Sequence, residues 1–309
     1  MKNFINLKDI PASDLKKIIL DAKKRKAKRK KLNTLDVDKD SPLKGKLLIQ
    51  MFEKSSLRTR LSFYLAIKQL GGAALTLRPD ELHLTKGGES LADTAKILST
   101  YGDGFILRTD SDKKIEDFSK NLTIPIINLL SPSSHPCQVL SDIFTVEEIK
   151  KKSISKLKIC WIGDGNNNVI NSLIVASVKF SFNLNIGCPK KYEPKKQILN
   201  WVKKNKKKIY IFNNANQAAK NADVIFTDKV VSMNDRINKS KKIKEFKNFR
   251  VNSKVMSQAR KDAIFLHCLP RGSEVSSDVF LGKQSKVWQQ AYNRIHVQKS
   301  ILLWCFEKK

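Results

Sequence analysis

Short apolar runs alternate with amphipathic stretches along this chain, and the whole pattern occurs twice. Such alternation is typical of an α/β domain with a mainly parallel sheet. We therefore expect two doubly wound domains, residues 1–150 and 151–309, with a last helix at about 288–306 that packs back on the first domain. The expected strands are Lys46–Phe52, Ala73–Leu77, Gly104–Arg108 and Ile124–Asn128, then Leu157–Ile162, Leu184–Gly187, Lys208–Phe212, Asp223–Thr227 and Ala263–His267.

The composition favours a globular cytoplasmic protein. A chain of 309 residues with 41% hydrophobic content is long enough for two cores. We find neither a signal-like start nor an apolar segment of the length that a membrane span needs, which is about 18 residues. The five cysteines are odd in number and contain no CxxC pair, so we expect reduced thiols and no metal site.

The formal net charge of +31 raises the question of a nucleic-acid partner. The lysines lie in blocks spread along the chain, such as residues 23–31 and 239–244, and no zinc-finger spacing, RNP-like strand or GxxG loop accompanies them. We therefore interpret the charge as a solvated basic surface and consider a nucleic-acid partner unlikely.

Two motifs in the first half have the chemistry of an anion site. Residues 56–60, Ser-Leu-Arg-Thr-Arg, follow an expected strand and open a helix, where hydroxyls, backbone N–H groups and arginines suit a phosphate. Ser56 alone is equally typical of an ordinary helix cap. His135 and Gln138 lie one helical turn apart after another strand, and both can donate to a carbonyl oxygen.

The second half offers polar turns at strand ends. Residues 163–168 form a glycine- and asparagine-rich turn without the GxGxxG fingerprint, so we reject a dinucleotide site and favour the head group of an amino acid. Asp228 follows one strand, and Cys268 follows another in the run His-Cys-Leu-Pro; either could be an ordinary turn residue. Arg294 adds a cation from the last helix.

Taken in order, these motifs resemble those of the carbamoyltransferase family. The family's phosphate motif SxRTR is matched by residues 56–60, with Leu57 where threonine is usual, and HPCQ at 135–138 and HCLP at 267–270 match letter for letter. The ornithine branch of the family carries an Asp-x-x-x-Ser-Met loop and an asparagine pair. This chain offers Asp228, Ser232 and Met233 for the loop, and Asn167 and Asn168 for the pair.

The resemblance implies an enzyme that makes citrulline and phosphate from carbamoyl phosphate and L-ornithine, in arginine biosynthesis, without a metal or organic cofactor. It implies catalytic roles for Arg108, His135, Gln138, Cys268 and Arg294. The carbamoyl phosphate ligands would be Ser56, Leu57, Arg58, Thr59, Arg60, Arg108, His135, Gln138, Cys268, Leu269 and Arg294, and the ornithine ligands Asn167, Asn168, Asp228, Ser232 and Met233. It also implies a homotrimer or a multiple of trimers, in which His83 and Lys86 reach a neighbouring subunit's site.

Three departures from the family pattern leave the acceptor open. They are Leu57, Val230 in place of tryptophan, and Asn234 in place of glycine after Ser-Met. Putrescine, lysine or an acylated ornithine are therefore alternative acceptors. A catalytically inactive basic relative that binds anions or nucleic acid is the alternative from another class.

Overall fold

The computed structural model describes residues 1–82, 88–231 and 239–307. The chain divides into two compact units, which we call unit 1 (residues 1–144 and 292–309) and unit 2 (residues 145–291). One boundary falls within helix α5 (Pro136–Lys150) and the other within helix α12 (Val287–Phe306). No helix in the described part of the chain combines the length and the apolar character that crossing a membrane requires.

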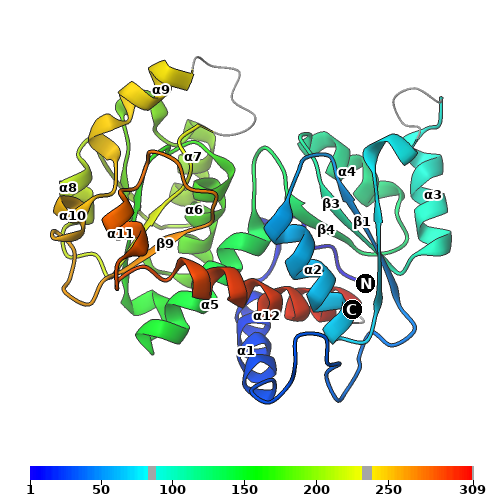
Figure 1. The fold of residues 1–309 in the computed structure, drawn as a ribbon. Helices are drawn as coiled ribbons and strands as arrows, with labels where there is room; N and C mark the ends of the chain where they lie inside the picture. The colour runs from blue at the N-terminus through cyan, green and yellow to red at the C-terminus, as the bar shows by residue number, and fades with distance from the viewer. Residues whose placement is uncertain (83–87, 232–238, 308–309) are drawn as a thin grey trace. The chain divides into compact units, whose positions relative to one another are not determined.

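Unit 1 is built on a four-stranded parallel sheet in the order β2-β1-β3-β4 (Figure 1). Apolar side chains on one face of the sheet, including Ile49 and Phe105, form a buried cluster with side chains of α3 and α4, among them Phe118 of α4. On the edge of the sheet, Phe4 forms a parallel bridge to Ile127. The strands are β1 (Leu47–Phe52), β2 (Ala73–Leu77), β3 (Gly104–Arg108) and β4 (Ile126–Leu130), and the helices are α1 (Ala12–Lys28), α2 (Leu57–Gln69), α3 (Leu91–Tyr101), α4 (Asp112–Asn121), the first part of α5 and most of α12.

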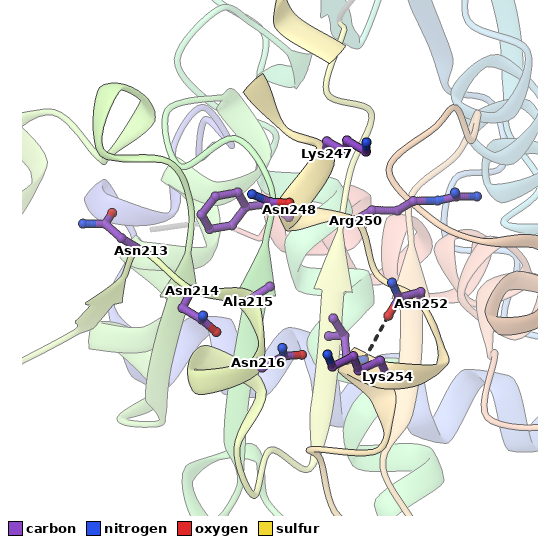
Figure 2. Close-up of a pocket in the computed structure, with 11 residues that line it drawn as sticks. Asn213, Asn214, Ala215, Asn216, Lys247, Asn248, Arg250, Asn252 and Lys254 are labelled. Carbon is purple, nitrogen blue, oxygen red and sulfur yellow. Dashed lines mark hydrogen bonds between the residues drawn. The ribbon is translucent and has the colours of Figure 1, made fainter. Parts of the chain in front are cut away.

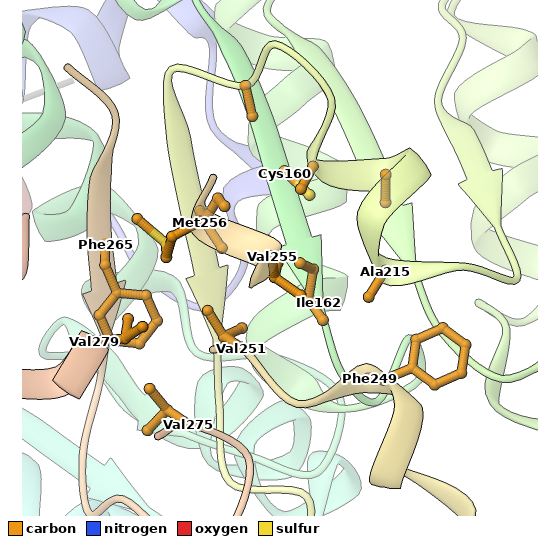
Figure 3. Close-up of a cluster of buried hydrophobic side chains, with 14 of the residues drawn as sticks. Cys160, Ile162, Ala215, Phe249, Val251, Val255, Met256, Phe265, Val275 and Val279 are labelled. Atoms are coloured by element: carbon orange, nitrogen blue, oxygen red, sulfur yellow. The ribbon is translucent and has the colours of Figure 1, made fainter. Parts of the chain in front are cut away.

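Unit 2 is built on a five-stranded parallel sheet in the order β7-β6-β5-β8-β9. Cys160, Ile162 and Phe265 on one face pack against short helices in a cluster that Figure 3 shows. The strands are β5 (Lys158–Ile162), β6 (Asn183–Gly187), β7 (Tyr210–Phe212), β8 (Val224–Thr227) and β9 (Ile264–His267), and the helices are α6 (Asn168–Phe180), α7 (Lys196–Lys204), α8 (Ala215–Ala219), α9 (Lys239–Glu245), α10 (Ser253–Met256) and α11 (Ser277–Leu281). Single 3-10 turns lie at η1 (Leu7–Asp9), η2 (Pro79–Leu82), η3 (Ile154–Lys156), η4 (Lys190–Tyr192) and η5 (Lys247–Phe249).

The predicted fold class is confirmed: two α/β units, each with a parallel sheet. Apart from the edge strands β2 and β7, the strands are runs of mostly buried apolar residues because helices cover both faces of such sheets. The prediction that the fourth strand starts at Ile124 is wrong, since β4 begins at Ile126, after Pro125. Proline has no N–H to donate to the ladder and therefore tends to precede a strand of this kind.

Candidate active site

Many of the predicted site residues lie at the carboxyl ends of strands, beside the point where the strand order of each sheet reverses. In unit 1 the chain winds outward from β1 to β2 on one side and through β3 to β4 on the other. The direction in which strands are added therefore reverses between β1 and β3. In unit 2 the corresponding reversal lies between β5 and β8. In open parallel sheets, ligands bind at the carboxyl ends of the strands beside such a reversal. The carboxyl ends of these strands, and the segments that directly follow them, carry residues 56–60, Arg108, residues 163–168 and Asp228.

The loop after β1 leads into a 13-residue helix, α2, with Ser56 at its N-cap. The Ser56 side chain makes no capping hydrogen bond, so a purely capping role does not explain it. A helix N-terminus presents unpaired N–H groups and partial positive charge, which favour an anion. Among its first residues, Leu57 and Arg60 are exposed, Arg58 is half-buried and Thr59 is buried.

Arg294 on α12 joins two of these motifs within unit 1. Its Nη2 donates to Thr59 Oγ1 at 2.6 Å, and its Nη1 donates to Gln138 Oε1 at 2.7 Å. The Gln138 amide in turn donates to Asp142 Oδ1 at 2.7 Å, which uses one of its two hydrogens. This chain of buried hydrogen bonds fixes the guanidinium and the carboxamide before any ligand binds. Asp142 supports the site, although it is not among the residues predicted from the sequence.

His135 is 5% exposed and lies in a strongly cationic environment. Burial, followed by the charges of Arg294, Arg108 and Arg58, holds the pKa of His135 well below its usual value. The imidazole is therefore neutral at physiological pH and can donate one hydrogen bond without adding a charge. The three arginines come from α12, β3 and α2. The fold therefore places around His135 three charged residues that are widely separated in the sequence.

Glu53, at the end of β1, supports the same edge of the sheet. Its backbone N–H donates to the Arg108 carbonyl at 3.0 Å, and its carboxylate accepts from Thr109 Oγ1 at 2.5 Å. The same carboxylate is paired with Lys114. These contacts tie the ends of β1 and β3 together. Glu53 is not among the residues predicted from the sequence, although its place directly before the Lys-Ser-Ser run was an available signal.

In unit 2, the turn of residues 163–168 links β5 to α6. Gly163 has φ +138°, a conformation that L side chains rarely adopt, and a Cβ there would lie 3.3 Å from Thr227 Oγ1. The turn therefore lies beside the end of β8, next to Asp228. Asn167 caps α6, accepting from the N–H groups of Val169 and Ile170 at 2.9 and 3.0 Å. Its oxygen is thus committed to the helix, and its amide hydrogens are the groups left for a ligand.

Asp228 and Cys268 meet at the ends of β8 and β9. The Cys268 thiol donates to Asp228 Oδ1 at 3.0 Å. The next residue, Leu269, has φ +63°, which is uncommon for a residue with a side chain and is a kind of strain found at functional sites. The two predicted residues therefore form one polar cluster.

His267 supports this cluster from within. Its Nδ1 accepts from the Leu269 N–H at 2.8 Å, and its Nε2 lies 3.0 Å from Glu274 Oε1. Burial opposes ionisation of Glu274, but hydrogen bonds from His267 and the Gly272 N–H lower the pKa of Glu274 overall. The neutral tautomer with its proton on Nε2 satisfies both contacts. Glu274 is a further residue that the sequence analysis did not find.

Asp228, His267 and Cys268 place one possible metal-ligand atom each within 4.8 Å of one another. The hydrogen bonds of His267 occupy both of its ring nitrogens, however. Two ligand groups then remain, fewer than the three or four protein ligands of a zinc site. We interpret the cluster as a hydrogen-bonding site.

Four of the predicted residues, His83, Lys86, Ser232 and Met233, lie outside the described residues, as does Asn234. Val230, at the position where the family usually has tryptophan, is buried and belongs to the apolar cluster of unit 2. Among the other predicted site residues, Arg58, Thr59, Arg108 and Gln138 lie around Arg294 and His135 in unit 1. The positions of Ser56, Leu57 and Arg60 are set by the first turn of α2. The predicted residues of unit 2 lie along the ends of β5, β8 and β9.

Unit 2 also contains a cavity of about 360 Å³ away from these motifs, which Figure 2 shows. Its lining is polar and basic: Asn213, Asn214, Ala215, Asn216, Lys247, Asn248, Phe249, Arg250, Asn252, Lys254 and Val255. Asn214 and Asn252 use their side-chain oxygens to cap α8 and α10. None of these lining residues is one of the predicted site residues.

Comparison with known proteins identifies the family. Residues 2–148 match the carbamoyl-P binding domain of aspartate/ornithine carbamoyltransferase, and residues 155–305 match its Asp/Orn binding domain. The chain therefore belongs to the aspartate/ornithine carbamoyltransferase family, and the resemblance predicted from the motifs is confirmed.

Individual relatives cover almost the full length. The ornithine carbamoyltransferase of Brucella suis biovar 1 (strain 1330) is 40% identical over 100% of this chain and 97% of that protein. That of Ruthia magnifica is 42% identical over 98% of this chain and 99% of its own. Among solved structures, ornithine carbamoyltransferase from Pyrococcus furiosus has a TM-score of 0.90 and 38% identity, covering 97% of this chain and 96% of its own. The anabolic ornithine carbamoyltransferase from Campylobacter jejuni has a TM-score of 0.88 and 36% identity, covering 99% of each chain.

Proposed function

We propose that this chain transfers the carbamoyl group of carbamoyl phosphate to the side-chain amine of L-ornithine, forming L-citrulline and phosphate. The names of its relatives support this activity. The observation that carries the proposal is the neutral, buried His135 with three guanidinium groups around it at the start of a helix. A fixed set of donors of this kind stabilises negative charge that develops on a reacting carbonyl.

In the proposed reaction, residues 1–150 bind carbamoyl phosphate. The N-terminus of α2, from Ser56 to Arg60, holds the phosphate as a dianion. His135, Gln138 and the guanidinium groups of Arg108 and Arg294 donate to the carbamoyl oxygen and the bridging oxygen. Because the bonds from Arg294 to Thr59 and Gln138 already fix these groups, little reorganisation is needed when the substrate binds.

Residues 151–309 bind ornithine in the proposed reaction. The amide hydrogens of Asn167 and Asn168 suit the carboxylate, and Asp228 suits the α-ammonium group, with Ser232 and Met233 as further contacts. Cys268 and the backbone at Leu269 position the side-chain amine, which must be neutral to attack. Attack on the carbamoyl carbon forms a tetrahedral oxyanion. The carbon–oxygen bond to phosphate then breaks, so that phosphate leaves with the bonding electrons and takes up the proton that the attacking nitrogen gives up.

The activity is tested by measuring citrulline release with ornithine, putrescine, lysine, N-acetylornithine and aspartate as parallel acceptors. We expect turnover with ornithine. The Arg58→Gln variant should lose about 10²- to 10³-fold in kcat/KM, the usual effect of removing one charge-stabilising donor. Lys68→Gln, an exposed lysine on the same helix, is the matched control and should match the wild type. Turnover with another acceptor alone would overturn ornithine as substrate, and no turnover with any would overturn the activity.

We infer that the chain assembles as a homotrimer or a multiple of trimers. Leu57, Leu61 and Tyr64 form an exposed apolar stripe on α2, with 71, 52 and 40% exposure. A stripe of this kind supports the proposal that another subunit covers this face of unit 1 in the assembly. Light scattering on the purified protein measures the mass directly. Leu61→Lys should shift it towards the monomer if this stripe lies at the interface, and a monomeric wild type would contradict the assembly.

We place the enzyme in the cytoplasm and in arginine biosynthesis, a step shared with the urea cycle. The five cysteines, all within the described part of the chain, form no disulfide, which is in keeping with a reducing compartment. The relative from Campylobacter jejuni carries the word anabolic in its description, which supports the biosynthetic direction. Restoration of growth without arginine, in a bacterial strain that lacks this activity, is the test of that direction.

A further inference from the structure

Helix α9 buries a lysine and exposes an isoleucine. Lys242 is 4% exposed, whereas its neighbour Ile243 is 43% exposed. Removing an ammonium group from water costs free energy that only a close partner offsets. The orientation of α9 therefore places the Lys242 ammonium group in the interior and leaves the Ile243 side chain partly in solvent.

The partner is Asp164, in the turn between β5 and α6. Lys242 Nζ lies 2.8 Å from Asp164 Oδ2, and Asp164 is itself 7% exposed. The other carboxylate oxygen of Asp164 accepts from the Asn166 N–H at 2.9 Å, and its carbonyl accepts from Trp161 Nε1 at 3.1 Å. Asp164 therefore organises the turn that leads to Asn167 and Asn168, and Lys242 neutralises its charge.

A second set of contacts holds α9 and this turn against the same support, η4. Tyr192, in η4, lies under the Lys242 ammonium at 5.4 Å and bonds to Glu245 of α9 through its hydroxyl. On the other side, a Cβ on Gly165 would lie 2.6 Å from the Tyr192 carbonyl oxygen, so the turn packs directly on the backbone of η4. Helix α9, η4 and the turn thus form one interlocked group within unit 2.

We propose that Lys242 is a positioning residue for the amino-acid substrate, which acts through Asp164 on the turn that carries Asn167 and Asn168. This inference rests on the proposed function. Lys242 itself does not contact the substrate. Loss of its charge leaves a buried carboxylate without its cation, and the turn shifts to bring that carboxylate to water. The asparagine amide groups then lose the placement that binds an amino-acid head group.

The test compares the kinetics of Lys242→Met, Lys242→Arg and Lys244→Met. Lys242→Met should raise KM for ornithine by about tenfold or more while KM for carbamoyl phosphate stays within about twofold, since one such contact typically amounts to a factor of ten. Lys242→Arg keeps the charge and should restore most of the affinity. Lys244 is exposed on the same helix, so Lys244→Met should match the wild type.

The double variant Asp164→Asn/Lys242→Met separates positioning from stability. It removes both charges and so should recover thermal stability relative to Lys242→Met. Its KM for ornithine should stay raised, because the side chain at position 164 has still lost the hydrogen bond that anchors the turn to α9. If Lys242→Met does not fold, the double variant gives the kinetic result. An unchanged KM for ornithine, or an equal rise in both KM values, overturns the inference while the proposed function stands. If the wild type shows no turnover with any of the acceptors, both this inference and the proposed function are overturned.

Discussion

At the residue scale, His135 shows how burial and charge set the chemistry of one side chain. Its imidazole is 5% exposed, and the nearby guanidinium groups oppose a further positive charge. Its pKa in the folded protein therefore lies well below the value near 6.5 of an unfolded chain. Between those two values, the unfolded chain binds a proton that the folded chain does not.

This difference predicts the direction of a pH effect. Because the unfolded state binds more protons, the contribution of His135 to stability is full above about pH 6.5 and falls as the pH drops towards its folded pKa, by up to about 1.4 kcal/mol per pH unit. Urea unfolding of the wild type and of His135→Asn at a series of pH values measures this contribution. The difference between the two free energies of unfolding should narrow as the pH falls from 7.5 to 5.5, values on either side of about 6.5. Parallel curves would contradict the assignment.

At the element scale, a buried ion network holds α12 to the first part of unit 1. Asp38 accepts from Arg29 Nη1 at 2.8 Å, from Lys299 Nζ at 2.7 Å and from Arg25 Nη1 at 3.3 Å. Lys299 is fully buried, and burial lowers its pKa to about 8 although Asp38 acts in the opposite direction. One carboxylate thus compensates three cations from two helices and the segment that follows α1.

Asp38→Asn should therefore destabilise unit 1 strongly. Removing the anion leaves buried cations uncompensated, and breaking a buried pair in this way costs about 3 to 5 kcal/mol. Chemical denaturation of the variant measures the loss. Asp40→Asn is the matched control, because Asp40 pairs with the same Arg25 from an exposed position and should cost no more than about 1 kcal/mol. Equal losses in the two variants would contradict this account.

The elements of the fold were largely predictable from the sequence, and the reason is physical. Strands buried on both faces are nearly continuous apolar runs, so β1 and β3 match the predicted ranges to within a residue. The edge strand β7 is shorter than predicted, starting at Tyr210 instead of Lys208. A strand with one free edge needs less apolar sequence, and polar residues before it do not mark where its hydrogen bonds begin.

The site was predictable only in part. Residues directly after strands, such as Asp228 and Cys268, could be selected because parallel strands bring their carboxyl ends to one edge. The residues that hold these site residues in place could not be selected from the sequence. Lys242 is one lysine in a lysine-rich run, and its partner Asp164 lies 78 residues away, so nothing local distinguishes it from Lys241 or Lys244. Asp142 and Glu274 likewise act through contacts that only the folded chain creates.

At the scale of the whole molecule, a formal net charge of +31 repels itself in the compact state. Raising the ionic strength from about 0.01 M to about 1 M shortens the screening length from roughly 30 to roughly 3 Å. We therefore expect the Tm to rise with sodium chloride. A phosphate salt should raise it further in the wild type than in Arg58→Gln, because the wild type also binds phosphate at the proposed anion site. A Tm that falls with added chloride would contradict the repulsion.

Unit 1 is made of two chain segments, residues 1–144 and 292–309, separated by all of unit 2. During synthesis on the ribosome, residues 145–291 emerge before residues 292–309 do. The first segment must therefore wait with the places of Lys299, Ile301 and Leu302 unfilled, and it exposes the surface that these buried side chains later cover. The part of the protein that is translated first is the part that is completed last, so its exposure to chaperones and proteases is set by the time needed to translate the rest of the chain.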